Sequence, residues 1–129
     1  MERHASVSLE DRQRLLDAFI GAARTGDVAA LEQMLAADVV SYSDGGGLVR
    51  ASKIPVLGRL RVAKFIHAFA FHFWTDVTVS TIRSNGTVSA LLSKDGDEFA
   101  IVSLAAGPDG IREIQWQMNP NKLARSLAA

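Results

Sequence analysis

The side chains of this sequence that could do acid–base or metal chemistry are few. Its three histidines are His4, His67 and His72, and the last two lie five positions apart, whereas two metal ligands on one helix face would lie four apart. The sequence has no cysteine, which excludes disulfides, thiolate zinc sites and cysteine nucleophiles. We therefore expect no metal site and no cofactor, and Asp44, His67 and His72 remain as candidates for general acid–base work.

His67 shares one face of a predicted helix with two aromatic residues, Phe71 at i+4 and Trp74 at i+7. One interpretation is the wall of a pocket with a titratable group, to which Tyr42 and Trp116 would also contribute. The other is a helix face packed under a sheet, with His67 hydrogen-bonded to a nearby carbonyl, and we favour this one. Trp116 fits the core better than a ligand contact, because an aromatic ring buries a large area.

Two short segments could form contact loops. Ser43-Asp44-Gly45-Gly46-Gly47 follows a predicted strand, and its glycines tolerate positive φ. It suits either a tight turn or a loop whose amides and Asp44 meet a partner, and it lacks the Gly-Lys-Ser/Thr ending of a phosphate-binding loop. Asn119-Pro120-Asn121-Lys122-Leu123 either simply ends a strand or forms a docking loop, with Lys122 as its charge and Leu123 as its anchor.

Hydrophobic periodicity and turn signals predict the elements that position these residues. Apolar residues at helical spacing predict helices at about 9–25, 28–38 and 59–73. Alternating patterns predict strands at about 39–43, 77–83, 87–93, 98–105 and 111–118, with a short strand at 48–50 and a loop at 53–58. Asn85-Gly86 is a strong signal for a hairpin turn.

This order predicts an α+β fold: a cone made of a curved, mostly antiparallel sheet packed on three helices. The 129 residues, 48% of them apolar, suit one domain with one core. We expect that domain to occupy residues 1–118 and to be followed by a tail at 119–129. The mouth of such a cone is a common place for a ligand.

The charge pattern argues against nucleic-acid binding by this domain. Fourteen basic and fourteen acidic residues are interleaved and give a formal net charge of zero, whereas phosphate-binding surfaces carry a basic excess. No apolar run approaches the roughly 20 residues of a membrane span, and the polar start does not resemble a signal peptide. We expect a cytoplasmic address, and the abrupt start into a helix signal suggests a piece of a longer chain.

The order of elements, together with GDVAALEQMLAADVV at 26–40, resembles the SnoaL-like branch of the NTF2-like superfamily. DGGG after the first strand and the NPxKL-like segment after the last resemble the C-terminal extension of SigJ-like extracytoplasmic-function sigma factors, with Asn121 where Asp is usual. The resemblance implies a non-catalytic domain that contacts the sigma core regions of its own polypeptide, and through them RNA polymerase, to modulate transcription initiation. The implied contact residues are Asp44, Gly45, Gly46, Gly47, Asn119, Pro120, Lys122 and Leu123.

The superfamily also includes enzymes, which leaves an alternative. Isomerases of this type need a carboxylate base on the first strand and two hydrogen-bond donors for an enolate oxygen, each donor worth about 3–4 kcal/mol. By alignment, Phe19 and Val102 occupy the donor positions, and Ser43 occupies that of the base, with Asp44 next to it. We therefore expect no catalysis, with a small-molecule-binding or polyketide-cyclase-like enzyme as the alternative. A homodimer through the open sheet face is a third hypothesis.

Overall fold

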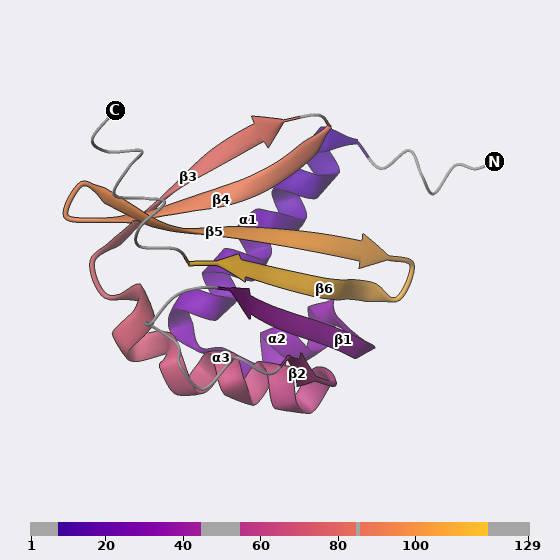
Figure 1. Cartoon of the computed structure of the whole chain (residues 1–129). Coiled ribbons are helices and arrows are strands. Elements are labelled where there is room, and N and C mark those ends of the chain that lie inside the picture. Colours follow the sequence, from indigo (N-terminus) through magenta and orange to yellow (C-terminus); the bar gives the residue numbers. More distant parts are fainter. Residues whose placement is uncertain (1–7, 45–54, 85, 119–129) are drawn as a thin grey trace.

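The computed structural model describes residues 8–44, 55–84 and 86–118 of the chain. Three helices and six strands form an α+β cone in which one curved sheet wraps around the helices (Figure 1). The elements are α1 (Leu9–Thr25), α2 (Val28–Met34), β1 (Leu35–Asp44), β2 (Val56–Leu57), α3 (Arg59–Trp74), β3 (Val77–Ser84), β4 (Thr87–Lys94), β5 (Asp97–Gly107) and β6 (Gly110–Gln117). The predicted fold class is confirmed.

α1 has the predicted bounds because both of its ends are capped. The Ser8 hydroxyl accepts a hydrogen bond from the Asp11 amide at 3.0 Å, and Gly26 ends the helix in the left-handed conformation. A Cβ on Gly26 would lie 3.0 Å from Nδ1 of His67 and 3.2 Å from Cβ of Ala70. Glycine at this corner therefore serves both the turn and the close approach of α3.

The boundary between α2 and β1 differs from the prediction. The helix ends at Met34, and the strand begins at Leu35, whereas we predicted a helix up to Asp38. Leu35 pairs with Ile111 of β6 and is fully buried, so sheet pairing outweighs the local helix preference of the alanines that follow it. A register irregularity between Leu35 and Val40 accommodates the extra residues.

The segment predicted as a loop at 53–58 contains the short edge strand β2. Val56 and Leu57 pair antiparallel with Ser41 and Val40 of β1, and the Gly58 amide donates to the Val39 carbonyl at 2.8 Å. The sequence could not predict this strand, because two residues are too few to show the alternation of a strand. The short strand predicted at 48–50 lies outside the described residues.

The sheet has the order β2-β1-β6-β5-β4-β3, and in it β1 and β6 are parallel whereas the other neighbouring pairs are antiparallel. Asp44 is the register partner of Gln117, so β1 and β6 end together at one end of the cone. The turn between β4 and β5 lies at the same end, on the left of Figure 1. We call this the open end of the cone.

Candidate functional site

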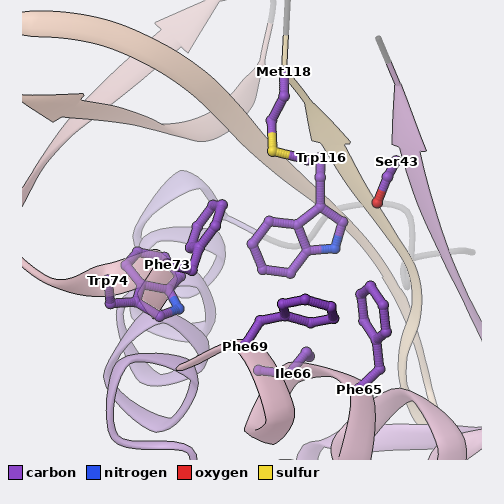
Figure 2. A pocket seen from close by; sticks show the side chains of 8 residues that line it. All are labelled: Ser43, Phe65, Ile66, Phe69, Phe73, Trp74, Trp116 and Met118. Atoms are coloured by element: carbon purple, nitrogen blue, oxygen red, sulfur yellow. The ribbon is translucent and has the colours of Figure 1, made fainter. Parts of the chain in front are cut away.

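An aromatic pocket lies at the open end, between α3 and the last residues of β1 and β6 (Figure 2). Its lining residues are mostly large and apolar: Ser43, Phe65, Ile66, Phe69, Phe73, Trp74, Trp116 and Met118. None of these described residues carries a carboxylate, an imidazole or a charge. Its polar groups are the Ser43 hydroxyl and the indole N–H groups of the two tryptophans.

The spacing of aromatic residues on α3 builds this pocket. Phe65, Phe69 and Phe73 follow one another at intervals of four, so they form one flank of the helix beside the buried stripe that ends at Trp74. The Phe73 ring meets that of Trp116 edge to face, with centroids 5.6 Å apart. Helix and sheet therefore interlock through their aromatic side chains.

Almost no free space remains in the pocket. The volume open to a water-sized sphere is about 20 Å³, room for one water molecule, since one sphere of that size needs roughly 10–15 Å³. Pockets for drug-sized ligands measure about 300–1,000 Å³. Among the described residues, the interior of the cone is thus a packed core, filled by phenylalanine and tryptophan side chains.

A buried hydrogen bond fixes Trp116 in this core. Its indole N–H donates to the Ser41 hydroxyl at 2.9 Å, and the two residues are only 6% and 2% exposed. The ring also lies against Phe19, with centroids 6.1 Å apart. Because its one polar group is satisfied within the protein, the Trp116 side chain is not poised for a ligand.

The positions aligned with an isomerase site hold no donors. Phe19 and Val102 are both 0% exposed, so a phenyl ring and an isopropyl group occupy the places of the two donors. Ser43 lines the aromatic pocket, and the side chain of Asp44 lies outside the described structure. The described residues therefore form no oxyanion hole of the isomerase kind.

Tyr42, His67 and Phe71, which the pocket interpretation included, do not line this pocket. Tyr42 alternates with Ser41 and Ser43, so it points to the outer face of the sheet. The ring of Phe71 is 80% exposed. Nδ1 of His67 donates to the Gly26 carbonyl at 2.8 Å, in agreement with the favoured interpretation, which expected a hydrogen bond to a nearby carbonyl.

The positions of His67 and Phe71 follow from the geometry of α3. The buried stripe of α3 consists of Val62, Ala63, Ile66, Ala70 and Trp74. His67 and Phe71 lie at one edge of this stripe, on the side of Gly26 and away from the aromatic pocket. Of the predicted set, Trp74 and Trp116 line the pocket.

A second hollow opens beside the aromatic pocket and shares its wall of Phe69 and Phe73. This open cleft has a volume of about 430 Å³, and its other lining residues are His72, Lys94, Asp95, Asp97 and Phe99. In the sequence, residues 94–97 only connect the strands predicted at 87–93 and 98–105. A signal was present, because this turn places one ammonium and two carboxylates within four positions, next to the aromatic Phe99.

Most of the predicted contact loops lie outside the described residues. This holds for Gly45, Gly46, Gly47, Asn119, Pro120, Lys122 and Leu123, and for the tail at 119–129 as a whole. The described chain nevertheless includes Asp44, the first residue of DGGG, and Met118, the residue before Asn119. Asp44 pairs with Gln117, so the described strands that precede the two undescribed segments end side by side at the open end of the cone.

Among the described residues, no group of three or more His, Cys, Asp or Glu side chains could hold a metal ion. None of the described helices is both long enough and apolar enough to span a bilayer.

Comparisons with known proteins identify the fold. A de novo designed protein with a curved β-sheet matches with a TM-score of 0.65 and 17% identity over 95% of this chain and 98% of its own. A SnoaL-like protein of unknown function from Burkholderia thailandensis matches with a TM-score of 0.64 and 16% identity over 87% and 98%. The extracytoplasmic-function sigma factor SigJ of Mycobacterium tuberculosis matches with a TM-score of 0.65 and 18% identity, over 88% of this chain and 44% of SigJ.

No protein-family model and no curated protein matches the sequence. The structural matches have low identity, so they show the fold alone. The chain has the NTF2-like, SnoaL-like fold, a class whose members differ in function.

Proposed function

We propose that this chain is a non-catalytic regulatory domain of an extracytoplasmic-function sigma factor, and that it modulates transcription initiation by contacting the sigma core regions. The observation that carries the proposal is the filled interior of the cone. A SnoaL-type enzyme needs an acid–base group and room for a substrate inside the cone, whereas the described interior offers about 20 Å³ and aromatic walls. A contact function needs surface instead.

The position of the two motifs supports the same proposal. DGGG and the NPxKL-like segment are more than 70 positions apart in the sequence, yet both begin at the ends of the paired strands β1 and β6. The similarity in fold to SigJ, of which this chain matches 44%, agrees with a domain attached to sigma regions.

The proposal is tested by binding in trans. The sigma regions encoded upstream of residue 1 would be expressed as a separate polypeptide and titrated with this chain by calorimetry. We expect micromolar or tighter binding, which corresponds to about −8 kcal/mol or better. An upstream sequence without sigma regions, or the absence of binding, would overturn the proposal.

Site variants sharpen this test. Replacing Lys122 and Leu123 together by alanine should weaken binding at least tenfold, because the anchor and its charge are lost. Thr78→Ala, an exposed change on β3 outside both motifs, is the matched control and should bind like the parent chain. The same variants, assayed in transcription with RNA polymerase, report whether the contact activates or inhibits.

The enzyme alternative makes a separate prediction. It requires a polar group inside the cone and turnover of a hydrophobic substrate, and among the described lining residues only Ser43 offers a polar aliphatic side chain. Self-association through the open sheet face is the third hypothesis, and sedimentation of the purified chain decides it.

A further inference from the structure

The open cleft has an aromatic lining and enough free volume to bind side chains of a partner. The rings of Phe69, Phe73 and Phe99 line it from α3 and β5, and those of Phe73 and Phe99 meet edge to face with centroids 5.6 Å apart. Its volume of about 430 Å³ accommodates one or two large side chains of a partner. Unlike the aromatic pocket, the cleft has this space unfilled.

The rim of the cleft is acidic. Asp95 and Asp97 line it together with Lys94, so the rim has a formal charge of −1 when His72 is counted as neutral. The ion pairs found between described residues lie elsewhere, so neither carboxylate forms an ion pair within the described part of the chain, Lys94 included.

Two charged residues next to the cleft do not offset the negative charge of its rim. Asp76 is exposed and precedes Val77, the strand partner of Lys94, so it adds a carboxylate nearby. The guanidinium of Arg24 is already engaged, since it donates to the Val77 carbonyl at 2.8 Å and lies over the ring of Trp74.

The turn that carries the rim is well defined. Asp95 and Gly96 both have positive φ, 56° and 83°, the pattern of a tight two-residue hairpin turn. Asp97 then pairs with Lys94 at the start of β5. The two carboxylates are therefore held by a fixed backbone, which lowers the entropic cost of binding a cation between them.

We propose that the open cleft binds a basic segment of the sigma core regions, with an apolar side chain on the phenylalanine floor and lysine or arginine at the acidic rim. This inference rests on the proposed function and names the part of the partner that is bound. Polypeptides that read DNA concentrate lysine and arginine where they meet phosphates. Aromatic rings bind the stems and charges of those side chains, and carboxylates pair with them.

The proposal implies a mode of regulation. A basic segment held in the cleft is not free to contact phosphate, so this domain and promoter DNA compete for the same residues. Other occupants fit less well. A second copy of this chain brings a net charge of zero, and an apolar small molecule makes no use of the rim.

The test measures binding of the separately expressed sigma regions by this chain at 50 and 200 mM salt, with and without a promoter duplex. The variant Asp95→Asn with Asp97→Asn should weaken binding about tenfold at low salt and flatten its salt dependence, because both rim charges are lost. Asparagine has nearly the same shape as aspartate and tolerates the positive φ of position 95. Asp109→Asn, an exposed change in the turn between β5 and β6, is the matched control and should bind normally. The duplex should displace the sigma regions from the parent chain.

Each other outcome overturns the inference. Binding that is normal in the double variant, or unaffected by the duplex, places the sigma contact elsewhere and leaves the proposed function intact. A dimer that sediments as such and dissociates in the double variant identifies a second copy as the occupant. If the sigma regions do not bind even the parent chain, the proposed function fails as well.

Discussion

The aromatic pocket and the open cleft share the wall of Phe69 and Phe73 but differ about twentyfold in free volume, near 20 Å³ against 430 Å³. On one side, Trp116 and Met118 from the sheet fill the space. On the other, the turn after β4 carries short carboxylates that leave it open. Phe69 and Phe73 of α3 thus pack into the core on the side of the aromatic pocket and line the surface on the side of the open cleft.

The difference separates two kinds of function. Catalysis in a cone needs an enclosed polar chamber, because donors and acids act strongly where water is excluded. The enclosed volume here is filled with rings, and the described charges near it lie at the surface, on the rim of the cleft. This difference supports the proposed contact function over the enzyme alternative.

The largest loss of stability is expected for a change in the side chains that fill the aromatic pocket. Trp116→Ala removes the ring that joins α3 to the sheet, and we expect it to lower the free energy of unfolding by about 3–5 kcal/mol. Urea denaturation followed by circular dichroism measures this change. A loss below about 1 kcal/mol would mean that the ring is not part of the core and that the pocket can open.

A smaller effect is expected from the hydrogen bond that fixes this ring. Ser41→Ala leaves the buried indole N–H without its acceptor, which should cost about 1–3 kcal/mol. Trp116→Phe in the Ser41→Ala background removes the orphaned N–H as well. The double variant should therefore lose less than the sum of the two single changes, and strict additivity would contradict a direct interaction.

On the cleft side, Phe99→Ala should cost about 1–2 kcal/mol, because its half-buried ring packs against Phe73 but also faces solvent. The measurement is again urea denaturation. A loss as large as that of Trp116→Ala would erase the distinction between pocket and cleft. Sigma binding of the folded variant then reports whether the ring also contributes to the contact.

The smallest effect on stability is expected at the rim. Asp97→Asn changes an exposed side chain without an ion pair in the described structure. The free energy of unfolding should therefore change by no more than about 0.5 kcal/mol. Thermal unfolding checks this value. A marked rise in stability would indicate that the rim charges repel one another, whereas a marked loss would reveal a structural role for the carboxylate.

Most of the fold could be predicted from the sequence because its elements carry local signals. Ser8 and Gly26 mark the ends of α1, and alternation with tight turns marks the four strands after α3. The elements that were missed depend on distant partners. β2 exists through its pairing with β1, and the α2–β1 boundary is set by the pairing of Leu35 with Ile111.

The site was less predictable for the same reason. Helical spacing groups His67, Phe71 and Trp74, but only packing decides which edge of that group is covered, and Phe71 is exposed. The alternation of β1 would have placed Tyr42 outside if Ser41 had been recognised as a core residue. The cleft combines a helix flank with a turn some 25 positions later, and no local pattern reports such proximity.

β1 pairs with β6 although Gln117 follows Asp44 by 73 positions. Closing a loop of this length costs on the order of 4 kcal/mol in chain entropy, and parallel, non-local pairing is slow to form. During synthesis β1 emerges early and β6 last among the described strands, so the open end of the cone cannot assemble until translation of the domain is nearly complete. If the proposed function holds and the sigma regions come first in the polypeptide, those regions are synthesised before this domain can fold, and the rate of translation sets the length of that interval.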